Sequence, residues 1–318
     1  MKYQPPFHIS ADAVNLIAGI AALVERFTSR SGSADALKLR RANQIRTIQA
    51  TLAIEGNRMS EEQVSDILNG KRVTAPLRQI QEVKNAIAVY NVARVLDPYS
   101  IDDFLKAHGM MMSALIDEAG VFRHGDVGVA NADETVIHIA PPAHRVPDLI
   151  NSLFTWLYTS EDHPLIQSCV FHYELEFIHP FADGNGRMGR LWQSIILAKW
   201  APVFLQIPVE TMVNNNQDRY YQAINNSTDA KDSGIFIDFM LREIMNALLE
   251  QTSLEKNISA PADAVFRCIL TNPGIRAGMI AEKLSVSLRT AERYLRELKQ
   301  AERIEFRGAP RNGGYYTK

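Results

Sequence analysis

Apolar residues recur at helical spacing along most of the chain, and this period constrains the fold more than any other feature. The first such segment, residues 11–29, carries on one helical face Val14, Ile17, Ile20, Leu23 and Phe27. Six further segments repeat the pattern, with Gly, Pro, Ser or Asp between them: 37–56, 61–70, 77–96, 101–115, 146–159 and 165–179. The sequence therefore predicts a mainly α-helical fold.

The period changes within residues 122–142. Apolar residues alternate in two short stretches, 127–129 and 136–139, which predict strands joined by a polar turn at 131–134. A lone hairpin is only marginally stable in water. We therefore expect this one to pack against the helical body.

Composition places the chain among ordinary globular proteins. Its 318 residues are 46% hydrophobic and 22% charged, which is enough for a sizeable core and two or three domains. The N-terminal stretch has no apolar signal-peptide region and no run of eighteen apolar residues occurs, so we expect no membrane partner and a cytoplasmic location. Cys169 and Cys268 lie in apolar surroundings and are expected to be buried free thiols.

Residues 179–190, HPFADGNGRMGR, carry the densest chemistry. The groups that bear it are His179, Asp183, Asn185, Arg187 and Arg190. Glycines on both sides of the asparagine let successive N–H groups point into one anion-binding concavity, and a helix starting there adds its positive dipole end. Arginines three residues apart share a helical face and suit phosphate oxygens. A base, a metal-binding carboxylate and a phosphate cradle together indicate transfer chemistry on a nucleotide.

This stretch resembles the Fic family motif, H-x-F-x-[D/E]-G-N-G-R-x-x-R, and matches every fixed position. No GK[ST] follows the glycines, so a P-loop is not indicated. The resemblance implies a Fic-type helical core with a β-hairpin flap beside the active site, where the flap holds the target segment. Arg123 and the Pro141-Pro142 end are also similar to that flap.

Two other interpretations of the motif stay open. One is a Gly-rich helix-entry loop with surface arginines and no chemistry. The other is a zinc site, because His172, Glu176 and His179 are spaced to line one helical face. Zinc would use His179 and leave the phosphate cradle unexplained.

The resemblance implies ATP as substrate and Mg²⁺ as cofactor. His179 would be the general base and Asp183 would hold the metal between the α- and β-phosphates. Asn185 and the neighbouring N–H groups would cradle the α-phosphate. Arg187 would hold the β-phosphate and Arg190 the γ-phosphate. The full set assigned to the nucleotide is Asp183, Gly184, Asn185, Gly186, Arg187, Met188, Gly189 and Arg190, with Tyr220, Tyr221, Val136, Ile137, His138 and Ile139 on the nucleoside side.

Residues 51–57, TLAIEGN, resemble the family's inhibitory motif, [S/T]-x-x-x-E-[G/N]. Glu55 is then expected to pair bidentately with Arg190 and to withdraw it from the γ-phosphate. Thr51, one turn earlier, would only support the helix by hydrogen bonding. The alternative is that Glu55 is a solvated last-turn residue with Gly56 as the helix C-cap.

The C-terminal segment differs in charge from the rest. Residues 257–318 hold 11 Lys or Arg and 6 Asp or Glu, a local net charge of +5. Since the whole chain has a net charge of −2, the other residues have a net charge of −7. The pattern predicts a winged helix-turn-helix with helices at 264–271, 275–284 and 287–300 and strands around 304–306 and 315–316. The last helix would bury a stripe of Leu288, Ala291, Leu295 and Leu298. Its outward face, which would contact DNA, consists of Arg289, Thr290, Arg293 and Arg296.

The expected organisation is an N-terminal helical region (1–100) with the inhibitory helix at about 37–56, a catalytic core (101–250) and the winged helix (257–318), with a boundary near 251–261. The expected activity is transfer of AMP from ATP to a protein hydroxyl. The alternatives are removal of AMP by the same site, and a DNA-binding regulator that senses ATP. The sequence leaves the target protein unnamed; automodification is expected, and a homodimer is compatible with the chain.

Overall fold

The computed structural model describes residues 3–28, 34–130, 136–255, 260–301, 303–309 and 313–318. Helices dominate these ranges, as the apolar period predicts. The α-helices are α1 (Ala11–Thr28), α2 (Ala34–Ile54), α3 (Glu61–Leu68), α4 (Leu77–Val92), α5 (Ile101–Met111), α6 (Val146–Thr159), α7 (Pro164–Ile178), α8 (Asn185–Trp200), α9 (Val209–Asn215), α10 (Gln217–Ala230), α11 (Gly234–Glu255), α12 (Ala260–Thr271), α13 (Ala277–Lys283) and α14 (Leu288–Gln300). Short 3-10 helices are η1 (Ala93–Val95), η2 (Ala143–Arg145) and η3 (Pro202–Leu205).

Two antiparallel hairpins complete the described structure. The first pairs β1 (Gly128–Ala130) with β2 (Val136–Ile139), so the predicted flap strands are confirmed, while its turn lies outside the described residues. The second pairs β3 (Ile304–Arg307) with β4 (Gly314–Thr317).

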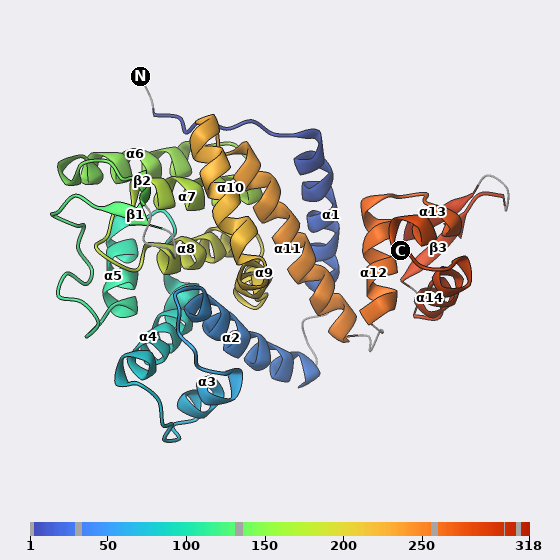
Figure 1. The fold of residues 1–318 in the computed structure, drawn as a ribbon, viewed down its shortest axis with the longest axis horizontal. Helices are drawn as coiled ribbons and strands as arrows, with labels where there is room; N and C mark the ends of the chain where they lie inside the picture. Colours follow the sequence, from blue (N-terminus) through green and yellow to red (C-terminus); the bar gives the residue numbers. More distant parts are fainter. Residues whose placement is uncertain (1–2, 29–33, 131–135, 256–259, 302, 310–312) are drawn as a thin grey trace.

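The helices α7 and α8 lie at the centre of the larger lobe (Figure 1). Residues 165–175 of α7 are all buried, including the polar side chains of Gln167, His172 and Glu174. α8 is equally enclosed, although it carries the polar side chains of Arg187, Arg190, Gln193 and Ser194. Buried polar groups need partners, so the neighbours of α8 determine its chemistry.

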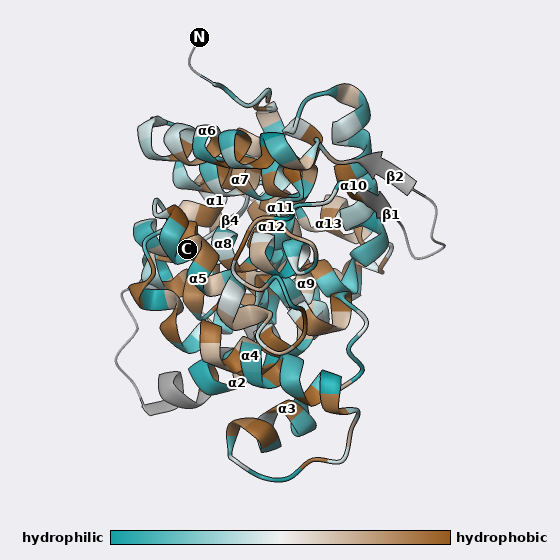
Figure 2. Ribbon diagram, turned by 90° about the vertical axis from the view of Figure 1, so that its left-hand side faces the viewer, coloured by the Kyte–Doolittle hydropathy of each residue, from teal (hydrophilic) through white to brown (hydrophobic). Residues whose placement is uncertain are grey.

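Other helices surround this pair. α1 packs beside α11, and α2 contacts α4, α8 and α9 (Figure 1). Figure 2 shows that most helices carry hydrophobic and hydrophilic residues on different sides. Val14 departs from the predicted apolar face of α1, because its side chain is 57% exposed.

The inhibitory-helix candidate, α2, ends in a Schellman motif. The N–H of Gly56 bonds the carbonyl of Ala53, and the N–H of Asn57 bonds the carbonyl of Leu52. Gly56 has φ +84°, the left-handed conformation that favours glycine. The predicted helix end at Gly56 is confirmed, and it places Glu55 directly after the last residue of α2, Ile54.

The C-terminal elements form a smaller lobe beside α1 and α11 (Figure 1). Its helices and strands lie where the sequence predicts them, and Ser287 caps α14 through the N–H of Thr290. α11 ends at Glu255 and α12 starts at Ala260, so the predicted boundary segment, 251–261, spans the end of one helix and the start of the next, with 256–259 outside the described residues. One expectation was wrong: Leu288 is 50% exposed, and the buried stripe of α14 is Ala291, Leu295 and Leu298.

Both cysteines are buried and unpaired, as expected, and burial raises the pKa of the Cys169 thiol to about 12. Within the described ranges, each helix is too short or too polar to span a lipid bilayer.

The close approach of α7 and α8 generates a stability prediction. A Cβ added to Gly189 would lie 2.6 Å from Cδ2 and 2.9 Å from Nε2 of His172. We expect Gly189→Ala to lower the free energy of unfolding by about 1–3 kcal/mol through overpacking. Gly278→Ala, on α13, is the control, because its Cβ would meet nothing within 4 Å. Equal urea midpoints for the two variants would contradict this packing.

Candidate functional site

The loop that joins α7 to α8 begins with His179 in a left-handed conformation, φ 51° and ψ 61°. This conformation costs a residue with a Cβ roughly 1–2 kcal/mol, so surrounding contacts must hold it. Nδ1 of His179 lies 3.4 Å from the carbonyl oxygen of Glu176. If that contact is a hydrogen bond, Nδ1 carries the proton and Nε2 is the basic nitrogen.

Arg123 fixes the loop from the flap side. Its guanidinium, which is buried, donates from Nε to the carbonyl of His179 at 2.7 Å and from Nη1 to the carbonyl of Gly125 at 2.8 Å. Nη2 bonds the carbonyl of Pro141, and the main-chain N–H bonds that of Pro180. A single buried cation at the C-terminus of α7 thus ties both ends of the flap to the loop.

Asn185 shapes the loop from within. Its Oδ1 accepts the N–H of Phe181 at 2.9 Å, and its Nδ2 donates to the carbonyl of the same residue at 2.9 Å. These bonds use one of the two hydrogens on Nδ2, so the expected α-phosphate contact from this side chain stays a prediction. The residue curls the loop so that α8 starts beside His179.

His108, on α5, also holds the loop, and the sequence analysis missed it. Its Nδ1 accepts the N–H of Gly120 at 2.9 Å, so its Nε2 donates to the carbonyl of Asp183 at 3.0 Å. Its ring stacks on Phe181 with centroids 3.6 Å apart. Burial lowers the pKa of this histidine to about 4, which keeps the ring neutral in this role. No motif surrounds it in the sequence that could have revealed it.

The first turn of α8 supplies the predicted anion cradle. The first bond of the helix runs from the N–H of Met188 to the carbonyl of Gly184, so the preceding N–H groups have no partner within the helix. Arg187, 3% exposed, donates Nη2 to Asp183 Oδ1 at 3.0 Å, while its Nε and Nη1 have no hydrogen-bond partner in the described part of the chain. A buried cation with unmatched donors beside a helix N-terminus favours an anionic ligand.

Asp183 is the carboxylate of the site. Its Oδ1 accepts from the N–H of Gly184 at 2.6 Å and from Arg187. Its Oδ2 is held less tightly, 3.5 Å from Nη2 of Arg78 on α4. The side chain is 40% exposed, so a cation could reach it from solvent. Arg78 is a second residue that the sequence analysis missed.

Arg190 lies behind this cradle and binds α2. Its Nε donates to the Thr51 hydroxyl at 3.0 Å, and its Nη2 donates to the Thr51 carbonyl at 3.1 Å and to Glu55 Oε1 at 2.6 Å. The expected pair with Glu55 therefore exists, but it is monodentate rather than bidentate. Burial opposes the charge of Arg190, yet Glu55, Tyr220 and Glu176 together outweigh burial, and the pKa of the guanidinium is raised. Thr51 touches the arginine directly, which corrects the purely helical role predicted for it.

Gly186 allows this arrangement. A Cβ at that position would lie 2.7 Å from Glu55 Oε1 and 3.0 Å from Arg190 Nη1. The carboxylate of Glu55 thus rests against the first turn of α8, where the cradle would hold a phosphate.

Several residues assigned to the nucleotide lie elsewhere. Met188 is fully buried in the core, and Gly189 faces His172 of α7. Tyr220 is 1% exposed, and its hydroxyl lies 3.1 Å from His172 Nε2, so it belongs to the core. Tyr221 is 41% exposed, and partial burial together with the charge of Glu55 raises the pKa of its hydroxyl. The strand β2 carries Val136, Ile137, His138 and Ile139.

The zinc interpretation finds no support in the geometry. Nδ1 of His172 lies 2.8 Å from Gln193 Oε1, and Nε2 bonds Tyr220, so both ring nitrogens have protein partners. Among the described residues, no three His, Cys, Asp or Glu side chains are grouped to hold a metal ion.

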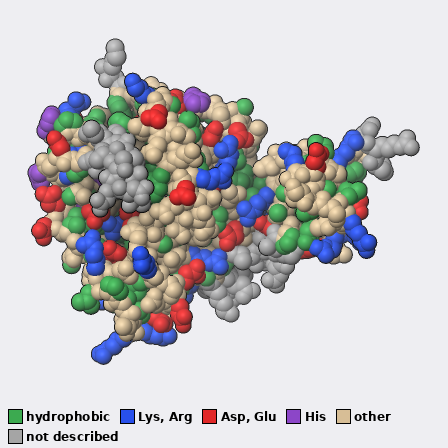
Figure 3. Space-filling model, viewed as in Figure 1, with side chains coloured by type: hydrophobic (Ala, Val, Ile, Leu, Met, Phe, Trp, Pro, Cys, Tyr) green, Lys and Arg blue, Asp and Glu red, His purple; other side chains and the backbone are tan. Residues whose placement is uncertain are grey.

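The arginines of α14 are exposed, as predicted. Arg289 and Arg296 face solvent, and the guanidinium of Arg293 lies 4.6 Å from the ring centre of Tyr294. The hydroxyl of Thr290 bonds that of Ser287 at 2.8 Å in the exposed helix cap. Lys and Arg side chains lie at several points of the smaller lobe (Figure 3). DNA contact stays a prediction.

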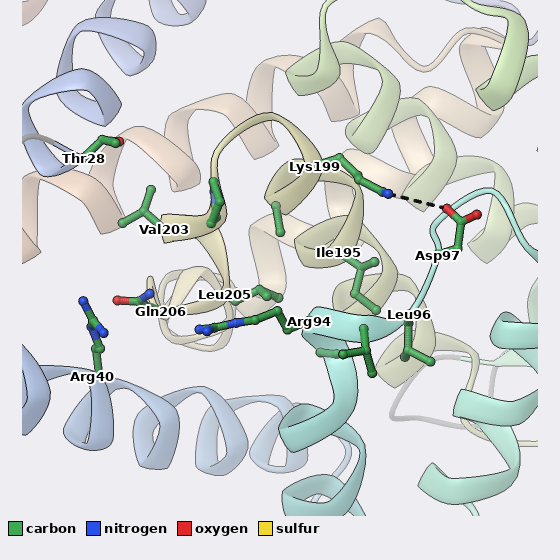
Figure 4. A pocket seen from close by; sticks show the side chains of 14 residues that line it. Thr28, Arg40, Arg94, Leu96, Asp97, Ile195, Lys199, Val203, Leu205 and Gln206 are labelled. Carbon is green, nitrogen blue, oxygen red and sulfur yellow. Dashed lines mark ion pairs between the residues drawn. The ribbon is translucent and has the colours of Figure 1, made fainter. Parts of the chain in front are cut away.

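A cavity of about 740 Å³ lies at the other end of α8 (Figure 4). Its polar lining includes Arg40, Arg94 and the ion pair of Lys199 with Asp97. At 1.5 Å per residue along the helix, it is about 20 Å from the cradle. None of the motif residues lines this cavity.

Comparisons with known proteins agree with this geometry. A profile of the Fic/DOC family matches residues 98–197. The chain is 28% identical over 221 residues to protein adenylyltransferase Fic of Nematostella vectensis, covering 64% of this chain and 48% of the relative. It is 33% identical over 176 residues to protein adenylyltransferase fic-1 of Caenorhabditis briggsae, covering 51% and 33%. The chain thus spans about half the length of these curated relatives, or less.

Solved structures extend the match. Fic-1 from C. elegans shares the fold, with a TM-score of 0.66 at 22% identity over 78% of this chain and 74% of that one. The crystal structure of a Fic family protein from Desulfovibrio desulfuricans G20 is similar over 99% of this chain and 98% of that one, with a TM-score of 0.76 and 39% identity. Since that likeness runs along nearly the whole of both chains, and the motif residues of 179–190 form one loop and helix start, the chain belongs to the Fic/DOC family.

Proposed function

We propose that this protein is a protein adenylyltransferase, which transfers AMP from ATP to a Ser, Thr or Tyr hydroxyl of a protein and is inhibited by its own Glu55. The names of the curated relatives support the reaction class. The observation that carries the proposal is the pair of buried arginines at the start of α8. Arg187 and Arg190 each retain donors without a hydrogen-bond partner among the described residues, beside the first turn of the helix. A polyphosphate chain would satisfy both arginines and the helix N-terminus together.

His179 supplies the base. With Nδ1–H turned to the carbonyl of Glu176, Nε2 takes the proton of the target hydroxyl. The hydroxyl oxygen then forms a bond to the α-phosphorus, and the bond from that phosphorus to the bridging oxygen of the β-phosphate breaks. Pyrophosphate leaves with the electron pair, and the N–H groups of the first turn of α8 stabilise the charge on the α-phosphate oxygens.

Asp183 fits the role of magnesium ligand. Its carboxylate offers hard oxygens, is partly exposed and is oriented by Gly184 and Arg187. Mg²⁺, when bound, neutralises charge on the departing pyrophosphate. Asp183 also orients Arg187, so the carboxylate and the β-phosphate arginine form one unit.

Glu55 inhibits by occupying Arg190. The γ-phosphate requires the guanidinium that Glu55 binds at 2.6 Å, and the carboxylate lies against Gly186. ATP can therefore place its terminal phosphate productively only after Glu55 is displaced. The interaction is largely buried on the arginine side, 2% exposed, so displacement is costly.

The reaction class is tested with Glu55→Gly and ATP labelled separately at the α- and γ-phosphates. We expect protein-bound label from α-labelled ATP only, and none when His179→Ala is added, while circular dichroism shows an unchanged fold. Label from γ-labelled ATP would indicate a kinase. Loss of AMP from a modified protein without any transfer would favour the removal reaction, and ATP binding with neither reaction would favour the regulator.

The metal role predicts that Asp183→Ala abolishes Mg²⁺-dependent transfer in the Glu55→Gly background. Asp183 also pairs with the buried Arg187, so the substitution is expected to lower the melting temperature, and circular dichroism checks that the fold is kept. Asp148→Ala, an exposed carboxylate in the first turn of α6, is the control and should keep full activity. Equal Mg²⁺ dependence in both variants would contradict the assignment.

The regulatory role predicts that Glu55→Gly raises automodification on the order of tenfold or more, as expected for a lost charge-assisted hydrogen bond of about 1.5–3 kcal/mol. Thr51→Ala should raise it less, because Thr51 also holds Arg190 in place. Adding Arg190→Ala to Glu55→Gly should remove most of the gain. An unchanged rate in Glu55→Gly would make Glu55 an ordinary helix-end residue.

A further inference from the structure

Polar side chains lie between Arg190 and a carboxylate of the core. The Nε of Arg190 donates to the hydroxyl of Thr51 at 3.0 Å. The hydroxyl of Tyr90, on α4, lies beside Thr51 and donates to Glu210 Oε1 at 3.3 Å. Thr51 and Tyr90 therefore lie between Arg190 and Glu210.

Glu210 is a buried carboxylate outside the catalytic loop. It lies on α9 and is 2% exposed. Its Oε1 also accepts from the Ser194 hydroxyl at 3.4 Å, while its Oε2 has no hydrogen-bond partner in the described part of the chain. Glu210 and Arg190 line one small cavity together with Gln193 and Ser194. The negative charge of Glu210 thus faces the positive charge of Arg190 from the core side.

Two carboxylates act on Arg190 from opposite sides. Glu55 binds it from α2 and must leave when ATP binds. The arginine then remains buried, and a buried cation is costly without compensation. Glu176 is also near enough to act on its charge, but its hydrogen-bonding partners are His172 and Tyr220. Glu210 lines a small cavity together with the arginine and accepts from Tyr90, and neither contact involves Glu55.

We propose that Glu210 is a positioning residue, which holds Arg190 through Tyr90 and Thr51 in the place where it receives the γ-phosphate once Glu55 has moved away. This inference rests on the proposed adenylyltransferase function. The inference assigns different roles to the two carboxylates: Glu55 blocks Arg190, and Glu210 keeps Arg190 in position for the γ-phosphate.

The charge of Glu210 depends on pH near neutrality. Burial raises its pKa to about 7, although Arg190, Tyr90 and Ser194 oppose that rise. The other groups that face it are uncharged, namely Met240 of α11 and Val213 of α9. Below pH 7 the carboxyl becomes protonated and resembles a glutamine at the same position. The hold on Arg190 should therefore weaken as the pH falls.

The first test needs no nucleotide. Glu210→Gln, Arg190→Met and the double variant form a thermodynamic cycle read from urea unfolding. We expect the double variant to lose less stability than the sum of the single variants, because both substitutions break the same interaction. Glu243→Gln is the matched control, since Glu243 is equally buried on α11, has a pKa raised to about 7 by burial and bonds Asn216 instead. Its cycle with Arg190→Met should be additive.

The second test measures ATP affinity by calorimetry in the Glu55→Gly background. Adding Glu210→Gln should raise the dissociation constant several-fold above pH 7, and Tyr90→Phe should act in the same direction. Well below pH 7 the difference between Glu55→Gly and Glu55→Gly/Glu210→Gln should vanish. Both proteins contain His179 and bind the same nucleotide, so this difference isolates Glu210. In the Arg190→Ala background, Glu210→Gln should have no further effect.

The outcomes are distinct. An additive cycle for Glu210 and Arg190, or an ATP affinity that is insensitive to Glu210→Gln at all pH values, would overturn the inference. Tyr90→Phe serves as the second probe if Glu210→Gln fails to fold, and an unchanged ATP affinity there has the same meaning. A coupled cycle in proteins that bind no ATP would count against the proposed function, while supporting the hold of Glu210 on Arg190.

Discussion

The structure of the site depends on one buried cation, Arg190. A guanidinium that is 2% exposed is tolerated only where its charge and donors are compensated. Here the compensation comes from the end of α2, through the Thr51 hydroxyl and carbonyl and the Glu55 carboxylate. The Schellman motif at Gly56 stops α2 at the residue that must reach the arginine. The contact of Arg190 with the end of α2 therefore both stabilises the fold and forms the inhibitory interaction.

The remaining site is arranged around that constraint. α7 and α8 approach closely at Gly189, and the loop between them is held by three polar anchors: Arg123 from the flap, His108 from α5 and Asn185 from within. Each anchor bonds main-chain atoms, so each fixes backbone shape rather than substrate. This division leaves Arg187, Asp183 and the first turn of α8 to face a ligand. It also explains how His179 keeps a left-handed conformation that its side chain disfavours.

The sequence predicts most of this fold, because helical periods and cap residues are local signals. Such signals predict the end of α2 at Gly56, the start of α14 at Ser287, the flap strands and the loop before α8. Prediction from sequence fails where a residue's role depends on neighbours that are distant in the chain. His108, Arg78 and Glu210 lie in no motif, and only packing brings them to the site. Tyr220 shows the converse: the segment resembles a nucleoside contact, but its ring is enclosed by α7 and α11. Thr51 was underestimated for the same reason, since its contact lies 139 residues away in the chain.

The central claim is that Glu55 competes with one particular group, the terminal phosphate on Arg190. Calorimetric dissociation constants for ATP and ADP, measured with the unmodified protein and with Glu55→Gly, test it most directly. The account predicts that the substitution tightens the binding of ATP several-fold and leaves ADP affinity unchanged, because ADP has no γ-phosphate to meet the freed arginine. Equal tightening for both nucleotides, or none for either, would contradict it.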